Sequence, residues 1–391
     1  MRMTRRHFMG TTVALAGLPL FGGAAFAALK PPSRPVTLTV ADVAGNLALT
    51  QAALQLYAET KPDWVSRIAF TKAPAPELPS KLKAQQAAGR VDIDLVLTGT
   101  DALSAGIAQG IWTDLAPYKA DLPDLSAILI PQAFKMQAMA QDRGVVVSYY
   151  PSGPLIEFMP DRVPTPPKTA EELLEWSRQH KNKFIYARPS NSGPGRTFLM
   201  GLPYILKDSD PKDPEKGWGK TWAYLEELGK NIEYYASGTT QTMRELGDGT
   251  RDIVISTTGW DINPRVLGTV PAEAKVGTLA GFHWVTDAHY MVVPKGVPED
   301  RLAVLLDLMN FMLTPKAQAY AYDQGYFYPG PAVKDVPLSI APAESQQAIK
   351  EFGRPEYDRW IADNPQEVPL DADRMVAAFR IWDERIGAKK S

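Results

Sequence analysis

The chain contains no cysteine, and this absence excludes several kinds of chemistry at once. Without thiols it forms no disulfide, no cysteine-ligated zinc or iron–sulfur site and no thiol nucleophile. There are only four histidines in 391 residues, so a histidine-rich metal site is not expected either. The 42 basic and 44 acidic residues nearly balance, whereas nucleic-acid binders usually carry a clear basic excess. We therefore expect no metal, no cofactor and no nucleic-acid partner.

Long hydrophobic runs are missing except near the N-terminus. There, paired Arg5 and Arg6 are followed by Phe8, an apolar run and a small-x-small cleavage site that ends at Ala27. This order is typical of an export signal, and the arginine pair resembles the twin-arginine type. We predict that residues 1–27 form a cleavable signal peptide and that the mature protein is periplasmic. General export and an uncleaved membrane anchor are the alternatives. Removing these residues leaves 364 residues with 39 basic and 44 acidic side chains, a net charge of −5.

The remaining chain alternates between strand-like and helix-like segments. In the first half, strands are expected at 36–40, 68–70, 93–97 and 145–150, and helices at 47–61, 78–88 and 102–109. The second half repeats this alternation, with strands at 184–187, 253–256 and 290–293, and helices at 170–179, 196–206, 221–230, 240–246 and 301–313. The pattern predicts α/β units with mostly parallel sheets flanked by helices. Ligands of such sheets bind at the carboxyl ends of strands, which points to the loops 42–46 and 98–101.

Several blocks resemble one known family. They are Asp92–Asp101 with Gly110–Leu115, Asp248–Trp260, Tyr290–Gly296, and Met312–Ala319 followed by Gly325-Tyr326. In this order they resemble the periplasmic solute-binding proteins of ABC importers (extracellular solute-binding family 1), in the branch that holds polyamine, thiamine and ferric-ion binders. Ala187–Arg196, which reads Ala-Arg-Pro-Ser-Asn-Ser-Gly-Pro-Gly-Arg, is similar to a motif of one subgroup of that family.

The resemblance implies a type II fold of two lobes joined by a hinge, with the ligand between them. We expect lobe 1 to comprise residues 35–148 and 287–335, lobe 2 residues 149–286, and a C-terminal helical segment residues 336–391. The implied function is to capture a small solute and deliver it to an inner-membrane permease, without catalysis. We expect the protein to be a monomer.

A Ser/Gly-rich loop before a helix is the best candidate for binding an anion. Asn191, Ser192 and Gly193 precede the helix that is expected to start near Arg196. Free backbone amides at a helix start favour negative charge, and an arginine adds a forked donor suited to carboxylate or phosphate. The alternative is an ordinary helix cap beside a solvated arginine.

Aromatic and acidic candidates suggest a second part of the ligand. Trp260 and Asp261 follow one strand, and Trp284, Asp287 and His289 precede the returning one. A tryptophan can stack on a flat or cationic group, and a carboxylate can pair with an amine. Together with the anion site they favour a zwitterionic or phosphate-bearing organic solute, such as a thiamine-like molecule.

Polyamine is the runner-up among ligands. Polyamine binders carry an acid where this chain has His289, and another where it has Thr197. These two departures weigh against a polyamine.

The last candidates come from strand ends and the expected crossover between the lobes. They are Asn46, Thr98, Thr100, Tyr149 and Tyr150. A tyrosine pair also suggests ferric-ion binding, for which Tyr234-Tyr235 in the second lobe is better placed. The aromatic residues between 320 and 328 are expected to pack beneath the C-terminal helices. A function of another class, an exported hydrolase with paired carboxylates, is the remaining alternative.

Overall fold

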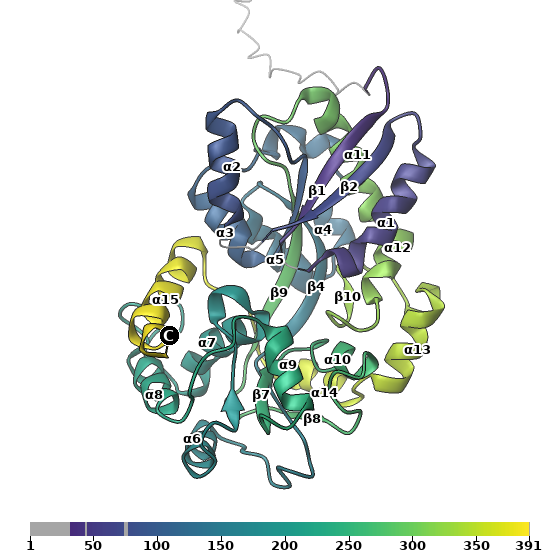
Figure 1. Ribbon diagram of the computed structural model, residues 1–391. Coiled ribbons are helices and arrows are strands. Elements are labelled where there is room, and N and C mark those ends of the chain that lie inside the picture. Colours follow the sequence, from purple (N-terminus) through teal and green to yellow (C-terminus); the bar gives the residue numbers. More distant parts are fainter. Residues whose placement is uncertain (1–31, 44, 74–76, 391) are drawn as a thin grey trace, which may run out of the picture.

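A computed structural model describes residues 32–43, 45–73 and 77–390 of the chain. The predicted signal peptide lies outside these residues. Within them the strands form one seven-stranded and one four-stranded sheet, each covered by helices (Figure 1). The prediction of an α/β fold is confirmed. None of the described helices is both long and apolar enough to cross a bilayer.

Lobe 1 is built on the seven-stranded sheet. Its strands are β1 (Val36–Asp42), β2 (Val65–Lys72), β3 (Leu95–Thr98), β4 (Val145–Gly153), β9 (Trp284–Val292), β10 (Gly330–Pro331) and β11 (Gln366–Glu367). Its helices are α1 (Leu47–Thr60), α2 (Leu78–Ala87), α3 (Thr100–Ala108), α4 (Leu125–Ile128), α5 (Pro131–Gln137), α11 (Glu299–Met312) and α12 (Pro315–Gln318). These elements share one hydrophobic core, in which Leu38, Leu97 and Leu305 are fully buried.

Lobe 2 is built on the four-stranded sheet and has its own core. Its strands are β5 (Leu155–Phe158), β6 (Phe184–Ile185), β7 (Ile253–Ser256) and β8 (Lys275–Gly277). Its helices are α6 (Ala170–Gln179), α7 (Gly193–Ile205), α8 (Gly219–Gly229), α9 (Thr239–Gly247) and α10 (Asn263–Val266). Phe198, Leu225 and Ile253 are among the fully buried members of this core.

Both sheets are mixed, which corrects the expectation that they are mostly parallel. In lobe 1, β1 pairs in parallel with β2 and β3, but β9 is antiparallel to both β3 and β4. In lobe 2, only β6 and β7 are parallel, because β5 runs antiparallel to its neighbours β7 and β8. The chain leaves lobe 1 along β4 and returns along β9. Because these two strands run in opposite directions between the lobes, they pair antiparallel.

The two crossing strands lie side by side and connect the lobes (Figure 1). Tyr150 of β4 is paired with Asp287 of β9, and all nine residues of each strand are buried. The sequence predicted a strand at 145–150 and one at 290–293, but both are longer because they continue from the lobe 1 sheet toward lobe 2.

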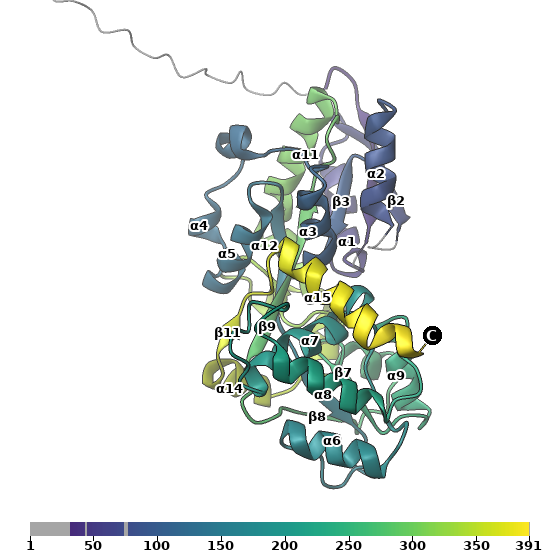
Figure 2. The same ribbon diagram turned by 90° about the vertical axis from the view of Figure 1, so that its left-hand side faces the viewer.

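The C-terminal segment contacts both lobes. It contains α13 (Ala343–Phe352), α14 (Glu356–Asp363) and α15 (Ala372–Arg385), and β11 between the last two helices pairs with β9. Met375 and Trp382 of α15 belong to the lobe 2 core, while the same helix lies against α3 of lobe 1 (Figure 2). The sequence predicts helices at 342–352 and 371–386, which α13 and α15 match within a residue at each end, whereas α14 was not predicted.

Candidate solute-binding site

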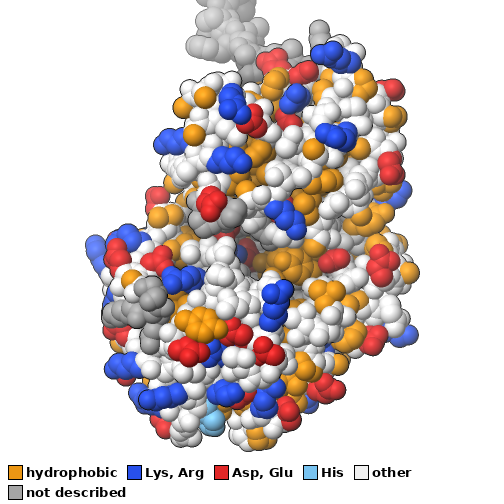
Figure 3. All heavy atoms as spheres, viewed as in Figure 1, with side chains coloured by type: hydrophobic (Ala, Val, Ile, Leu, Met, Phe, Trp, Pro, Cys, Tyr) orange, Lys and Arg blue, Asp and Glu red, His pale blue; other side chains and the backbone are white. Residues whose placement is uncertain are grey.

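A pocket of about 230 Å³ lies between the lobes. It is lined by Val43, Gly45, Gly99, Asp101, Tyr150, Asn191, Ser192, Gly193, Arg196, Gly238, Thr239, Thr240, Trp260, His289, Tyr326 and Phe327. In the space-filling view the surface is hollowed between the lobes, with hydrophobic side chains beside the hollow (Figure 3). Among the described lining residues, the charged side chains are Asp101 and Arg196.

Three helices begin at this pocket. The N-cap residues are Gly99 for α3, Ser192 for α7 and Gly238 for α9, and all three line the pocket. The first amides of a helix have no partner within the helix, and the helix dipole makes this end positive. The pocket therefore lies at the positive ends of three helices, one from lobe 1 and two from lobe 2.

The starts of α7 and α9 are tied together by hydroxyl groups. Ser192 caps α7 by accepting a hydrogen bond from the Gly195 amide at 3.1 Å, and its hydroxyl lies 2.7 Å from the Thr239 hydroxyl. The chain needs glycine at position 195, because a Cβ there would lie 2.1 Å from the carbonyl oxygen of Ala187. The Ala187–Arg196 motif thus brings α7 close to the preceding strand and sets its first turn against the pocket.

Arg196 lies on α7 and is bound by two aspartates. Its Nη1 is 3.2 Å from Asp101 of α3, and its Nη2 forms an ion pair with Asp287 of β9. Burial alone would lower the pKa of Arg196, but Asp287 and Asp101 outweigh it and raise this pKa, so the guanidinium stays charged. The predicted role of Arg196 as an anion donor stays a prediction, and two of its nitrogens already have protein partners.

Asp287 is surrounded by donors. Its carboxylate also accepts hydrogen bonds from the Tyr150 hydroxyl at 2.9 Å, the Thr100 hydroxyl at 3.2 Å and the amide of Ala288 at 2.9 Å. Burial and the nearby Asp287 raise the pKa of Tyr150, so this hydroxyl remains a donor. Thr100 and Asp287 therefore support the pocket from behind Arg196 and do not line it.

Aromatic side chains form another part of the pocket. Trp260 of lobe 2 meets the ring of Tyr326 edge-on, with ring centroids 5.2 Å apart, and Phe327 stacks on Tyr150 at 4.7 Å. His289 lies 3.2 Å from the Ser148 hydroxyl through Nδ1, and burial lowers its pKa to about 4. The pocket thus combines polar helix starts with a neutral aromatic wall.

Half of the predicted site residues line the pocket and half do not. The residues that line it are Tyr150, Asn191, Ser192, Gly193, Arg196, Trp260 and His289. Those outside the lining are Asn46, Thr98, Thr100, Tyr149, Asp261, Trp284 and Asp287.

Five of the residues outside the lining are engaged elsewhere, and we do not retain them as ligand contacts. Asn46 accepts a hydrogen bond from the Thr50 hydroxyl, Thr98 donates to the Gly99 carbonyl, and Tyr149 donates to Gln366. Trp284 is fully buried and donates to the Trp360 carbonyl.

Asp261, the fifth, is buried in a cluster with two arginines. It accepts hydrogen bonds from Arg265 at 3.5 Å, Arg354 at 2.8 Å and Tyr357 at 2.5 Å. This cluster binds the C-terminal segment to lobe 2 and has no access to the pocket.

Sequence reasoning missed nine lining residues. Val43, Gly45, Gly99 and Asp101 lie in the two strand-end loops that the α/β pattern had indicated, although they were not singled out. Gly238, Thr239 and Thr240 begin a correctly predicted helix, so its start was the available clue. The assignment of Tyr326 and Phe327 to packing beneath the C-terminal helices is corrected, because both face the pocket.

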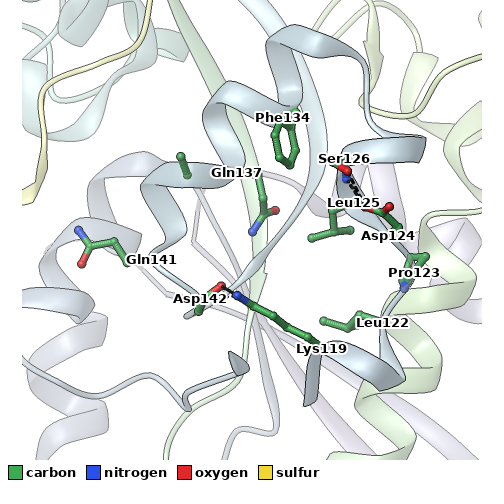
Figure 4. A pocket seen from close by; sticks show the side chains of 11 residues that line it. Lys119, Leu122, Pro123, Asp124, Leu125, Ser126, Phe134, Gln137, Gln141 and Asp142 are labelled. Carbon is green, nitrogen blue, oxygen red and sulfur yellow. Dashed lines mark hydrogen bonds and ion pairs between the residues drawn. The ribbon is translucent and has the colours of Figure 1, made fainter. Parts of the chain in front are cut away.

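A larger cavity, of about 760 Å³, lies on lobe 1 beside α4 and α5 (Figure 4). Its charged groups are already used. Lys119 pairs with Asp142 at 3.0 Å, and Asp124 caps α4 by accepting from the Ser126 amide. Since the charged groups there are already paired or capping and only one lobe contributes, we place the solute site in the smaller pocket.

Within the described residues, no group of three or more histidine, aspartate or glutamate side chains is arranged to hold a metal ion. The tyrosine pair considered for ferric ion is used elsewhere: Tyr234 donates to Glu245 at 2.5 Å, and Tyr235 packs edge-on against Trp382.

Two α/β lobes, two crossing strands and a pocket between the lobes define the class of type II periplasmic binding proteins. The chain matches the sequence model of the bacterial extracellular solute-binding proteins over residues 52–350, and it belongs to this family. It is a solute-binding component of an ABC transporter. No curated protein matches it in sequence.

Solved structures share the fold at low sequence identity. The spermidine/putrescine ABC transporter substrate-binding protein of Streptococcus pneumoniae has 13% identity and a TM-score of 0.59, covering 88% of this chain and 99% of its own. A periplasmic thiamin binding protein has 15% identity and a TM-score of 0.64, with 93% and 100% covered. The apo ferric ion-binding protein A of Pasteurella haemolytica has 15% identity and a TM-score of 0.61, with 89% and 97% covered.

Proposed function

We propose that the protein captures a small organic solute that carries a carboxylate or phosphate group and a flat apolar part. The convergence of three helix starts beside Arg196 carries this proposal. The N-termini of α3, α7 and α9, where the helix dipoles are positive, and the lining residues Thr239 and Thr240, whose side chains carry hydroxyls, form a wall suited to an anion. Trp260 and Tyr326 offer aromatic faces to the rest of the molecule.

The site residues of the proposal are those of the pocket. We assign anion binding to Arg196 together with the helix starts at Ser192, Gly193, Thr239 and Thr240, and stacking to Trp260. We further propose that residues 1–27 are a twin-arginine-type signal peptide cleaved near Ala27. The mature protein then works as a periplasmic monomer that delivers its solute to an inner-membrane permease without chemical turnover.

A cationic amine such as a polyamine is the second candidate, and one observation favours it. Asp101, Asp287 and Arg196 together carry a net charge of −1, and aromatic rings line the same pocket. An amine would gain from both features. Helix starts weigh against a ligand that carries positive charge alone, because their positive ends repel a cation that brings no anionic group with it.

Native mass spectrometry of the protein purified from a bacterial periplasm separates these candidates. We expect a retained molecule with a carboxylate or phosphate group. A retained polyamine would favour the second candidate, and a retained ferric ion would overturn both. Where nothing is retained, a thermal-shift screen of organic acids, organic phosphates and polyamines makes the same distinction.

Trp260 tests the location of the site once the solute is identified. Trp260→Ala should weaken binding about 5- to 30-fold, since stacking on an aromatic face contributes roughly 1–2 kcal/mol. Trp260→Phe should retain most of the affinity. The control is Trp64→Ala, because Trp64 packs on the lobe 1 core and does not line the pocket. Equal affinities of wild type and Trp260→Ala would place the solute elsewhere.

A further inference from the structure

One ion pair spans the solute pocket from lobe to lobe. Arg196 belongs to α7, whose buried residues lie in the lobe 2 core, and Asp101 belongs to the first turn of α3 in lobe 1. Their Nη1 and Oδ2 atoms are 3.2 Å apart, and both residues line the pocket. A solute that reaches the helix starts of both lobes therefore meets this pair.

The two acidic partners of Arg196 are held very differently. The Asp287 side chain is 1% exposed and has three further donors, from Tyr150, Thr100 and the Ala288 amide. The Asp101 side chain is 15% exposed, and its other hydrogen bond comes from the adjacent Ala102 amide. Asp287 is thus the fixed partner that orients the guanidinium, and Asp101 is the partner that can be exchanged.

Replacing Asp101 by a ligand group on Arg196 leaves the charge of the Asp101 carboxylate to be balanced. If an anionic group takes the place of Asp101 on Arg196, the Asp101 carboxylate loses its cation at the wall of a largely buried pocket. An unpaired charge in such surroundings is strongly unfavourable. A solute that carries a positive group next to its anionic group would pair with both residues and restore the balance.

We propose that the solute is zwitterionic and inserts between Asp101 and Arg196, its anionic group on Arg196 and its cationic group on Asp101. Before the solute enters, the same pair latches the two lobes together. This inference rests on the proposed function and narrows it, since a solute with an anionic group alone would bind poorly. Asp101 is then the residue that determines specificity for the positive group.

Three probes that differ by one charged group test the insertion. They are phenylalanine, 3-phenylpropanoate, which lacks the amine, and phenethylamine, which lacks the carboxylate. Isothermal titration should show that phenylalanine binds wild type at least about tenfold more tightly than either of the other two. In Asp101→Asn, 3-phenylpropanoate should bind more tightly than phenylalanine. The amine of phenylalanine has lost its partner there, and the carboxylate of 3-phenylpropanoate no longer competes with Asp101 for Arg196.

Two results would overturn the insertion. One is binding of 3-phenylpropanoate to wild type as tightly as phenylalanine, and the other is absence of any difference between wild type and Asp101→Asn for all three probes. Preference of wild type for phenethylamine would instead overturn the anionic part of the proposed function.

The latch is tested without any solute. The chain has no cysteine, so Lys83→Cys on α2 and Glu171→Cys on α6 provide two exposed sites for spin labels, one on each lobe. Electron–electron distance measurements should show that Asp101→Asn shifts the distribution to longer distances and that Asp101→Glu largely restores it. Asp114→Asn is the matched control, because Asp114 pairs with Arg143 within lobe 1. Identical distributions for wild type and Asp101→Asn would overturn the latch, whatever the probes show.

Discussion

Glu157 is a buried acid whose ionisation should oppose folding. It lies on β5 between β7 and β8, is fully buried, and neither of its carboxylate oxygens makes a well-formed hydrogen bond to the described residues. Burial, reinforced by the nearby Asp261 carboxylate, raises the pKa of Glu157 from 4.5 to about 8, although Ser256, Arg354 and Arg265 favour the ionised form. The folded protein therefore keeps this carboxyl group protonated at neutral pH.

The sign of the effect follows from which state binds the proton. Between about pH 4.5 and 8 the folded state retains the Glu157 proton that the unfolded state has lost, so raising the pH destabilises the fold. One proton changes the free energy of unfolding by about 1.4 kcal/mol per pH unit. From about pH 5.5 to 7.5, Glu157 should thus remove ~3 kcal/mol of stability.

Glu157→Gln removes this titration while preserving the shape of the side chain. Urea unfolding across that pH range should show the variant gaining stability relative to wild type as pH rises, up to ~3 kcal/mol at the upper end. Glu171→Gln makes the same chemical change at an exposed position on α6 and should leave the pH dependence unaltered. Parallel pH curves for wild type and Glu157→Gln would refute the reasoning, because they would mean that Glu157 ionises equally in both states.

Three further perturbations test other parts of the structure. Gly259 has φ +97°, and a Cβ there would lie 2.4 Å from the Tyr326 carbonyl oxygen, so Gly259→Ala should lower the free energy of unfolding by about 2 kcal/mol or more. Trp382→Ala removes a buried indole and its 3.0 Å hydrogen bond to Tyr186, and should cost about 3–5 kcal/mol in the same measurement. Burial holds the pKa of His289 at about 4 against 6.5, so His289→Gln should abolish a loss of stability that wild type shows as pH falls from 6.5 toward 4. An unchanged unfolding midpoint would contradict the prediction for Gly259→Ala or Trp382→Ala. For His289→Gln, the contradicting result is the same loss of stability below pH 6.5 as in wild type.

The fold was largely predictable because its elements carry strong local patterns. The helix at 170–179 was predicted to the residue. The structure shows the local signal that starts it: Thr169 is the N-cap, and its hydroxyl accepts a hydrogen bond from the Glu172 amide. Strand direction was less accessible. The strand β5 itself was not predicted, and its four buried residues carry no local signal that distinguishes an antiparallel from a parallel neighbour.

The pocket was only partly predictable, because burial depends on partners far away in the sequence. Trp260 and Trp284 look alike in the sequence, since each has an aspartate within three residues and a strand nearby. The structure places Trp260 against Tyr326 at the pocket and Trp284 in the core against Phe282. Helix starts were better guides than individual side chains, since Ser192 and Thr239 both mark pocket walls through the helices that they begin.

The two buried arginine–aspartate clusters, around Asp261 and around Arg196, differ in their ratio of arginines to aspartates, and this difference indicates which of them binds the solute. Around Asp261, two arginines surround one carboxylate with no access to the pocket, and their remaining donors bind carbonyls such as those of Phe352 and Ala274. Both arginines already bind acceptors within the protein, so we assign this cluster a structural role. Around Arg196 the ratio is reversed, with two carboxylates for one guanidinium, and one of the two lies at the pocket wall. An excess acid that is weakly held and faces a cavity is the arrangement that a charged ligand can enter, which is why we assign binding to the second cluster and not to the first.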